Sequence, residues 1–200
     1  MATTAAPYGG RVVELAGNRP NSNGNSLYPI ASNYGTSIFF GQPVVYSATN
    51  SSVEVPAATD FGGATQELYI GIFAGCTYTD PNLKYTVFKQ FYPASTVASD
   101  IQAYVLDDPN SIIQFEASTT AFDVFANLGK NYPLSATNGG SATTGNCNLS
   151  LNTTTAANNN PFKIVGIAQG PGNINAQTGN YVQVLVQARA GTHLFNRQNA

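Results

Sequence analysis

The sequence predicts an all-β fold, either an antiparallel β-sandwich or a small, jelly-roll-like β-barrel. Three observations favour this class. Apolar residues recur at every second position in several short segments, turn-forming residues separate these segments, and helical periodicity is nearly absent. Short strands between tight turns are typical of sandwiches and barrels. At 200 residues the chain is long enough for one β domain with its own hydrophobic core.

The clearest predicted strand covers residues 181–189, where three valines alternate with polar or mixed residues and should form a buried face. Residues 162–169 carry apolar side chains on both faces, which predicts a strand in the centre of a sheet. These two segments flank a turn-rich stretch, residues 170–180, and are expected to pair antiparallel. Further strands are predicted over residues 36–40, 44–47, 68–74, 85–92, 101–106 and 112–117.

One short helix is predicted over residues 120–129. Thr120 and Asp123 fit a capping box, and a glycine stands where the helix would stop. Phe122 and Phe125 follow at helical spacing. We expect both phenylalanines to pack against the β domain.

The chain is expected to consist of an extended N-terminal arm, residues 1–30, and a single β domain, residues 31–200. The arm is rich in turn-forming residues. Within the domain, residues 135–161 are dominated by Asn, Thr, Ser, Gly and Ala. They are predicted to form two exposed polar loops around a short edge ribbon that contains Leu149 and Leu151.

Charged residues make up only 9% of the chain, far below the roughly 25% of an average domain. Neutral polar residues replace them, and these cost less to bury against a partner than Lys or Glu. The net charge of −2 and the scattered basic residues argue against nucleic-acid binding. No apolar run reaches the roughly 18 residues that span a bilayer, and no secretory signal is visible, so neither membrane insertion nor secretion is expected.

Residues that carry chemistry are sparse. His193 is the single histidine, and no nucleophile motif, zinc-ligand spacing or phosphate-binding loop accompanies it. Cys76 and Cys147 are expected to be free thiols in a protein made in a reducing cytoplasm. We therefore expect no enzymatic activity, no cofactor and no metal site, and a structural role for His193.

Four blocks follow one another along the chain: APYGGR at residues 6–11, IFFGQPV at residues 38–44, VLDDP at residues 105–109 and YVQVLV at residues 181–186. Their order resembles a family of tailed-bacteriophage virion proteins, the cement or decoration proteins. The chain departs from that family at Gln42, where an acidic residue is common, and at Glu116, where Gln is usual.

The resemblance implies a structural virion protein made in the cytoplasm of a host bacterium. It would lie on the capsid exterior, bind the major capsid protein and bridge capsomers so that the head is stabilised. Self-association into a closed homo-oligomer is also expected, and a trimer is preferred over a dimer.

The N-terminal arm is the candidate contact region of such a protein. Pro7 supplies a rigid bend, Tyr8 an amphipathic aromatic ring and Arg11 a multidentate donor, and Val12 continues this segment. These four residues are the candidate capsid or subunit interface.

An alternative of another class is a carbohydrate-binding β-sandwich from a phage tail or displayed on the virion. Eleven Tyr and many Asn would provide stacking and hydrogen bonds to sugars. The absence of Trp counts against this alternative, because indole is the preferred stacking platform.

Overall fold

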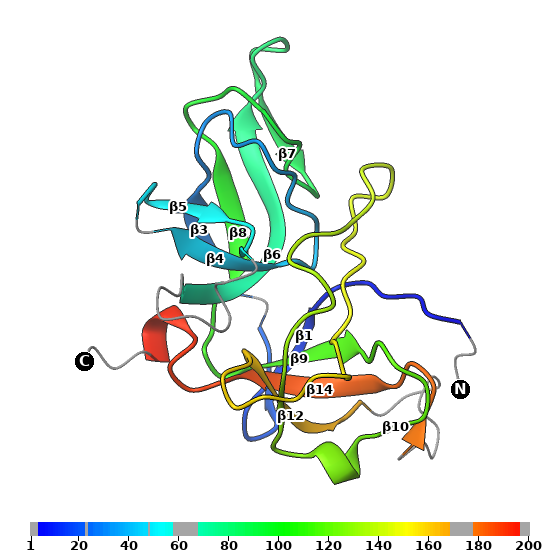
Figure 1. Ribbon diagram of the computed structural model, residues 1–200. Helices are drawn as coiled ribbons and strands as arrows, with labels where there is room; N and C mark the ends of the chain where they lie inside the picture. The colour runs from blue at the N-terminus through cyan, green and yellow to red at the C-terminus, as the bar shows by residue number, and fades with distance from the viewer. Residues whose placement is uncertain (1–3, 23, 48, 58–67, 169–177, 197–200) are drawn as a thin grey trace.

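The computed structural model describes residues 4–22, 24–47, 49–57, 68–168 and 178–196, in which nearly all regular structure is antiparallel β. Two sheets of six strands have a sandwich-like arrangement, with sheet A in the lower and sheet B in the upper part of Figure 1. The predicted all-β class is therefore confirmed. Within the described residues, no helix has the length and apolar character to cross a membrane.

Sheet A follows the order β11-β12-β14-β9-β1-β2, and each neighbouring pair is antiparallel. Its strands are β11 (Asn131–Tyr132), β12 (Phe162–Ile167), β14 (Gln183–Ala188), β9 (Ser111–Glu116), β1 (Arg11–Leu15) and β2 (Arg19–Pro20). Two short strands, β10 (Phe122–Asp123) and β13 (Thr178–Gly179), pair separately.

Sheet B follows the order β3-β8-β6-β4-β5, and β7 pairs with the C-terminal part of β6. Its strands are β3 (Ser26–Pro29), β8 (Gln102–Leu106), β6 (Leu68–Thr79), β4 (Pro43–Ser47), β5 (Ser52–Glu54) and β7 (Thr86–Lys89). The long strand β6 is therefore the centre of this sheet.

Strand β6 contributes to two hydrophobic cores, one on each of its faces, because side chains alternate across a strand. The inter-sheet core includes Tyr69 and Ile72 of β6 with Phe115, Phe162, Ile164, Val184 and Val186 of sheet A. The sheet B core includes Ile70, Phe73, Cys76 and Val105 with Ile38, Tyr92 and Ile101 from segments that connect the strands. A strand that is apolar on both faces is expected where both faces are covered.

Seven of the eight predicted strand segments contain a strand. These are residues 44–47, 68–74, 85–92, 101–106, 112–117, 162–169 and 181–189. The three valines of the last segment are buried, and β12 pairs antiparallel with β14 as expected. Residues 169–177, most of the turn-rich stretch between these two strands, lie outside the described residues.

Two strand predictions differ from the structure. Residues 36–40 form isolated bridges, such as the one between Ile38 and Tyr92, in place of a strand. Strand β12 does not occupy the centre of sheet A, because only the two-residue β11 lies beyond it. Its second face is open, so Val165 is 40% exposed although it is apolar.

The helix expected over residues 120–129 is reduced to one 3-10 turn, η1 (Phe125–Asn127). Ala121 has a φ of +55°, which is incompatible with a right-handed helix, and Phe122 then pairs as part of β10. The Ala126 N–H in the turn donates to the carboxylate of Asp123 at 3.0 Å, but the turn begins after Val124, which provides no side-chain cap. Phe122 is buried, but the second phenylalanine lies in the turn and is 51% exposed.

The N-terminal residues, treated above as an arm, supply strands to both sheets. Strands β1 and β2 belong to sheet A, and β3 belongs to sheet B. Residues 6–10 run between the two sheets before β1 begins (Figure 1). A 3-10 turn, η3 (Leu194–Asn196), follows β14 near the C-terminal end of the described residues.

The polar segment over residues 135–161 is exposed at residues 141–144 and 154–159, but its middle is buried. Cys147, Leu149 and Leu151 are nearly inaccessible and belong to the inter-sheet core. We call residues 145–152 the strap. Its backbone bonds to residue 9, to residue 40 and to residue 116 at the end of β9, so it ties the two sheets together.

Candidate binding site between the two sheets

The segment before β1 is held by hydrogen bonds of Ala6, Tyr8, Gly9 and Gly10. The Ala6 N–H donates to both carboxylate oxygens of Glu116, at 3.0 and 3.3 Å, and the Tyr8 hydroxyl donates to the side chain of Gln183. The Gly9 N–H donates to a strap carbonyl at 3.0 Å, and the Gly10 N–H donates to a carbonyl just before β4 at 2.7 Å. The segment is therefore fixed against both sheets.

Two glycines allow this close approach. Gly9 has a φ of +80°, and a Cβ there would lie 2.7 Å from the Cβ of Cys147. A Cβ on Gly10 would lie 2.8 Å from side-chain atoms of both Ile72 and Phe115, which belong to different sheets. Only glycine lets the backbone pass through this gap, since glycine has no Cβ and tolerates positive φ.

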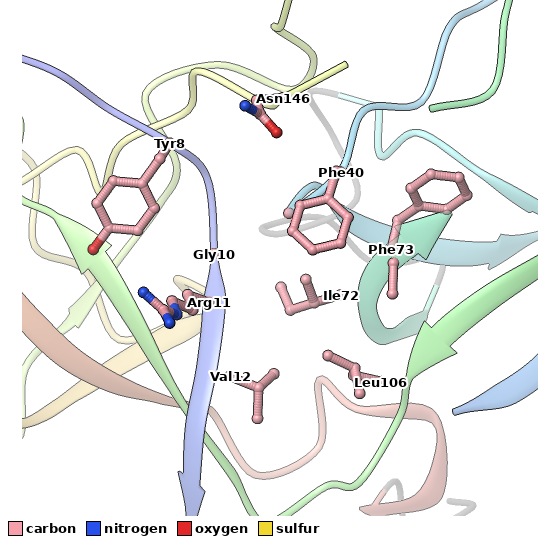
Figure 2. Close-up of a pocket in the computed structure, with 11 residues that line it drawn as sticks. Tyr8, Gly10, Arg11, Val12, Phe40, Ile72, Phe73, Leu106 and Asn146 are labelled. Atoms are coloured by element: carbon pink, nitrogen blue, oxygen red, sulfur yellow. The ribbon is translucent and has the colours of Figure 1, made fainter. Parts of the chain in front are cut away.

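A pocket of about 430 Å³ opens beside this segment. Figure 2 shows Tyr8, Arg11 and Val12 on one side and Phe40, Ile72 and Leu106 on the other. The remaining lining residues are Gly10, Gly41, Phe73, Ala74 and Asn146. The pocket therefore lies at the junction of β1, the turn before β4, β6, β8 and the strap.

Arg11 is the one charged side chain among the residues that line this pocket. A second hollow, of about 440 Å³, shares Arg11 and Val12 and is otherwise lined by Val13, Asn21 and Gln114. Neither lining contains an acidic residue. Within the described part of the chain, no hydrogen bond or ion pair of the Arg11 guanidinium is found.

Arg11 is exposed, whereas the other ionisable groups near the pocket are half-buried (Tyr8) or buried (Glu116). Burial raises the pKa of Tyr8 to about 12, so its phenol stays protonated and can donate to Gln183. Glu116 is only 2% exposed, and burial raises the pKa of its carboxyl although the Ala6 N–H opposes this shift. The Glu116 carboxylate accepts the Ala6 N–H, and no salt bridge joins it to Arg11 in the described residues.

The structure brings together three of the four candidate residues from the sequence. Tyr8, Arg11 and Val12 line the pocket, whereas Pro7 is half-buried beside it and does not. Sequence reasoning missed Phe40, Leu106 and the other lining residues, because they come from segments far apart in the chain. The one available signal was the FFG block at residues 39–41, whose second phenylalanine remains exposed.

An apolar strip continues from the pocket along sheet B. Leu27 lies directly opposite Tyr104 in the β3–β8 register, and the Tyr104 ring lies 5.8 Å from that of Phe88 on β7. Leu27 is 57% exposed and Phe88 63% exposed. Tyr104 and Leu106 are two residues apart on β8 and share a face, so the strip of Leu27, Tyr104 and Phe88 adjoins the pocket.

Phe88 owes its position to a glycine on the neighbouring strand. Gly75 has a φ of +124°, and a Cβ there would lie 2.7 Å from the Phe88 ring. This place coincides with a register irregularity between β6 and β8. The ring therefore occupies the space over Gly75 while most of its surface remains exposed to solvent.

Elsewhere in the described residues, no group of three His, Cys, Asp or Glu side chains is placed to hold a metal ion. Cys76 and Cys147 are free thiols, and burial raises their pKa to about 12 and about 11, which favours the unreactive neutral form. His193 is buried, its ring lies edge-on to Tyr69, and its Nδ1 accepts the Phe195 N–H at 3.2 Å. Its Nε2 is buried and has no hydrogen-bond partner among the described residues.

Comparison of the chain with protein-family models, with curated proteins and with solved structures finds no match. A function therefore has to be inferred from the surface that the two sheets present. The pocket and the apolar strip are its most distinctive features.

Proposed function

We propose that the protein is a cement or decoration subunit of a tailed bacteriophage, without enzymatic activity. It binds the major capsid protein on the outer face of the head and bridges capsomers. The observation that carries this proposal is the strip of Leu27, Tyr104 and Phe88, in which Leu27 and Phe88 are exposed and Tyr104 is half-buried, and which adjoins the inter-sheet pocket.

The strip has the composition of a protein-binding surface. Aromatic residues are enriched in interfaces and contribute most where they are surrounded by neutral contacts. Thr77 and Gln102, the residues of β6 and β8 paired beside Phe88, are neutral polar residues. Desolvation of such a surface costs little compared with one rich in Lys and Glu.

The way the sheets are joined suits a subunit that holds capsomers together. The segment before β1 contacts both sheets, and the strap bonds to this segment, to Phe40 ahead of β4 and to Glu116 at the end of β9. A pull on sheet B is therefore transmitted to sheet A through backbone hydrogen bonds and packed side chains. Large buried interfaces, on the order of a thousand square ångströms or more, complete such a bridge.

Self-association forms part of the proposal. Closed symmetric oligomers are the usual state of such subunits, and a trimer fits the local three-fold positions of an icosahedral head. Sedimentation equilibrium of the purified protein tests this part, with a monomer at micromolar concentration as the contrary result.

Co-sedimentation with heads assembled without this protein tests the main proposal. Wild-type protein should pellet with the heads, and the double variant Phe88→Ser, Tyr104→Ser should bind at least about tenfold more weakly because two central aromatic contacts are lost. The matched control is Phe125→Ser, which removes a similarly exposed phenylalanine from η1, away from the strip.

Melting temperatures of all three proteins show whether they are folded. Equal decoration by wild type and the double variant would contradict the choice of surface. Failure of the wild type to bind heads, together with binding to one class of glycan on an array, would favour the carbohydrate-binding alternative.

A further inference from the structure

The pocket between the sheets combines an apolar lining with one unpaired cation. We propose that an extended segment of the capsid protein places an apolar side chain in this pocket and a carboxylate against Arg11. The inference rests on the proposed function, because it names what the capsid protein contributes at this site.

The walls of the pocket fit an apolar group. Val12, Ile72 and Leu106 line it from three different strands, and Phe40, which is 44% exposed, stands at its opening. Its volume of about 430 Å³ lies near the lower end of ligand pockets, which span roughly 300–1,000 Å³. This space suits one large aliphatic or aromatic side chain.

The charge at the pocket selects for an anion. Arg11 is the one charged residue on the lining, and in the described structure its guanidinium has no acidic partner. The nearby Glu116 is buried and already accepts the Ala6 N–H. A planar guanidinium can hold a carboxylate through two parallel hydrogen bonds, whereas it would repel an ammonium group.

The pocket is formed before any ligand arrives. The Gly41 N–H donates to the Phe73 carbonyl and the Phe40 N–H donates to the Gly145 carbonyl, both at 2.9 Å. Gly10 bonds to Gly41 from the opposite wall at 2.7 Å. Since the three walls are tied to one another, binding needs little ordering of the backbone, which favours affinity.

The strip beside the pocket indicates that the occupant is part of a protein chain. A small acid would fill the pocket and leave Tyr104 and Phe88 uncovered. An extended segment that anchors one side chain in the pocket can lie across these rings, as apolar residues do in groove recognition. The two surfaces together therefore favour a capsid segment over a free metabolite.

The first experiment uses the purified protein and hexanoate as a probe. Amide signals of residues 10–12, 40–41 and 72–74 should shift in an NMR titration with hexanoate and remain unchanged with hexylammonium at the same concentration. Arg11→Gln should abolish the preference for the carboxylate. Arg19→Gln is the matched control, because Arg19 is an exposed arginine of β2 that does not line the pocket.

Equal shifts with the two probes, or an unchanged preference in Arg11→Gln, would overturn the assignment of an anion site. This experiment contains no heads, so its outcome is independent of the proposed function. If wild-type protein fails to bind heads while hexanoate shifts the pocket signals, the proposed function and the capsid segment fail, and the anion site stands.

The second experiment measures binding to heads. Arg11→Gln should weaken binding by about tenfold, as expected for an arginine at the centre of an interface, while Arg19→Gln should bind like the wild type. Hexanoate should compete with heads for the wild-type protein. Normal decoration by Arg11→Gln, with no competition by hexanoate, would show that the pocket serves a small acid only and would overturn the proposed capsid segment.

Discussion

The two faces of sheet B are covered to different extents. One face is sealed by the segments that connect the strands, and Ile70, Phe73 and Val105 are fully inaccessible there. The other face is covered by sheet A only at one end, near Tyr69, and exposes Phe88 at the far end. Apolar residues on the same strands thus stabilise the fold on one face and remain available for a partner on the other.

The largest expected difference between the faces is in stability. Phe73→Ala should lower the free energy of unfolding by about 3–5 kcal/mol, because it leaves a cavity in the sheet B core. Phe88→Ala should change it by no more than about 0.5 kcal/mol, since the ring is mostly exposed. Urea denaturation measures both. Similar losses in the two variants would mean that the strip is part of the folding core.

A smaller effect is expected at the wall of the pocket. Gly41 has a φ of +85°, and a Cβ there would lie 3.0 Å from the backbone oxygen of Tyr8. Gly41→Ala should therefore cost about 1–3 kcal/mol of stability from backbone strain. It should also weaken hexanoate binding by displacing the N-terminal wall. Gly17→Ala is the control, because Gly17 has a similar φ of +84° with open space around it, so it carries the strain without the contact.

His193 packs against Tyr69 at the end of sheet B that sheet A covers. The pH dependence of stability provides a test of this buried contact. Burial lowers the pKa of His193 from its ordinary value of 6.5. The unfolded chain therefore binds a proton more readily than the folded protein, and the stability associated with neutral His193 is lost as the pH falls below 6.5. The slope of unfolding free energy against pH below 6.5 should be flatter in His193→Gln. An unchanged slope would contradict a buried neutral histidine.

Glu116 should give the opposite pH dependence of the free energy of unfolding, and its effect should be the smallest of those considered. Burial raises the pKa of this carboxyl above its ordinary value of 4.5, so the folded protein binds the proton more readily than the unfolded chain. The contribution of Glu116 to stability should increase as the pH falls through the raised pKa toward 4.5. Glu116→Gln should lack this rise and be at least as stable as the wild type at neutral pH. Loss of stability in Glu116→Gln would mean that its charge is needed to hold Ala6.

Alternation predicted the strands whose residues have a clear buried face, and β14 is an example because its valines form one side of the inter-sheet core. The same rule failed at residues 36–40, since Ile38 and Phe40 bond to different segments and no continuous ladder forms. The helix prediction relied on a capping box, a stop glycine and helical spacing. It could not anticipate the positive φ of Ala121 or the pairing of β10 with β13.

The candidate site was partly predictable. Tyr8, Arg11 and Val12 were recognised as anchor types, and they line the pocket. The opposite wall was not predictable, because Phe40 and Leu106 approach it only through the packing of two sheets. The burial of the strap was not predictable from composition. Its Asn- and Thr-rich neighbours predicted exposed loops, but the few apolar residues of the strap, such as Leu149, are buried.

The hydrogen bond between Tyr8 and Gln183 joins residues near opposite ends of the sequence, and that between Gly9 and Leu149 also spans most of the chain. The Tyr8–Gln183 bond can form only once nearly the whole chain has been synthesised, and contacts of such high sequence separation are slow to form. The Tyr8 wall of the pocket is therefore fixed only when the chain is almost complete. A truncated or half-folded copy would lack this fixed wall, so under the proposed function docking would favour intact subunits.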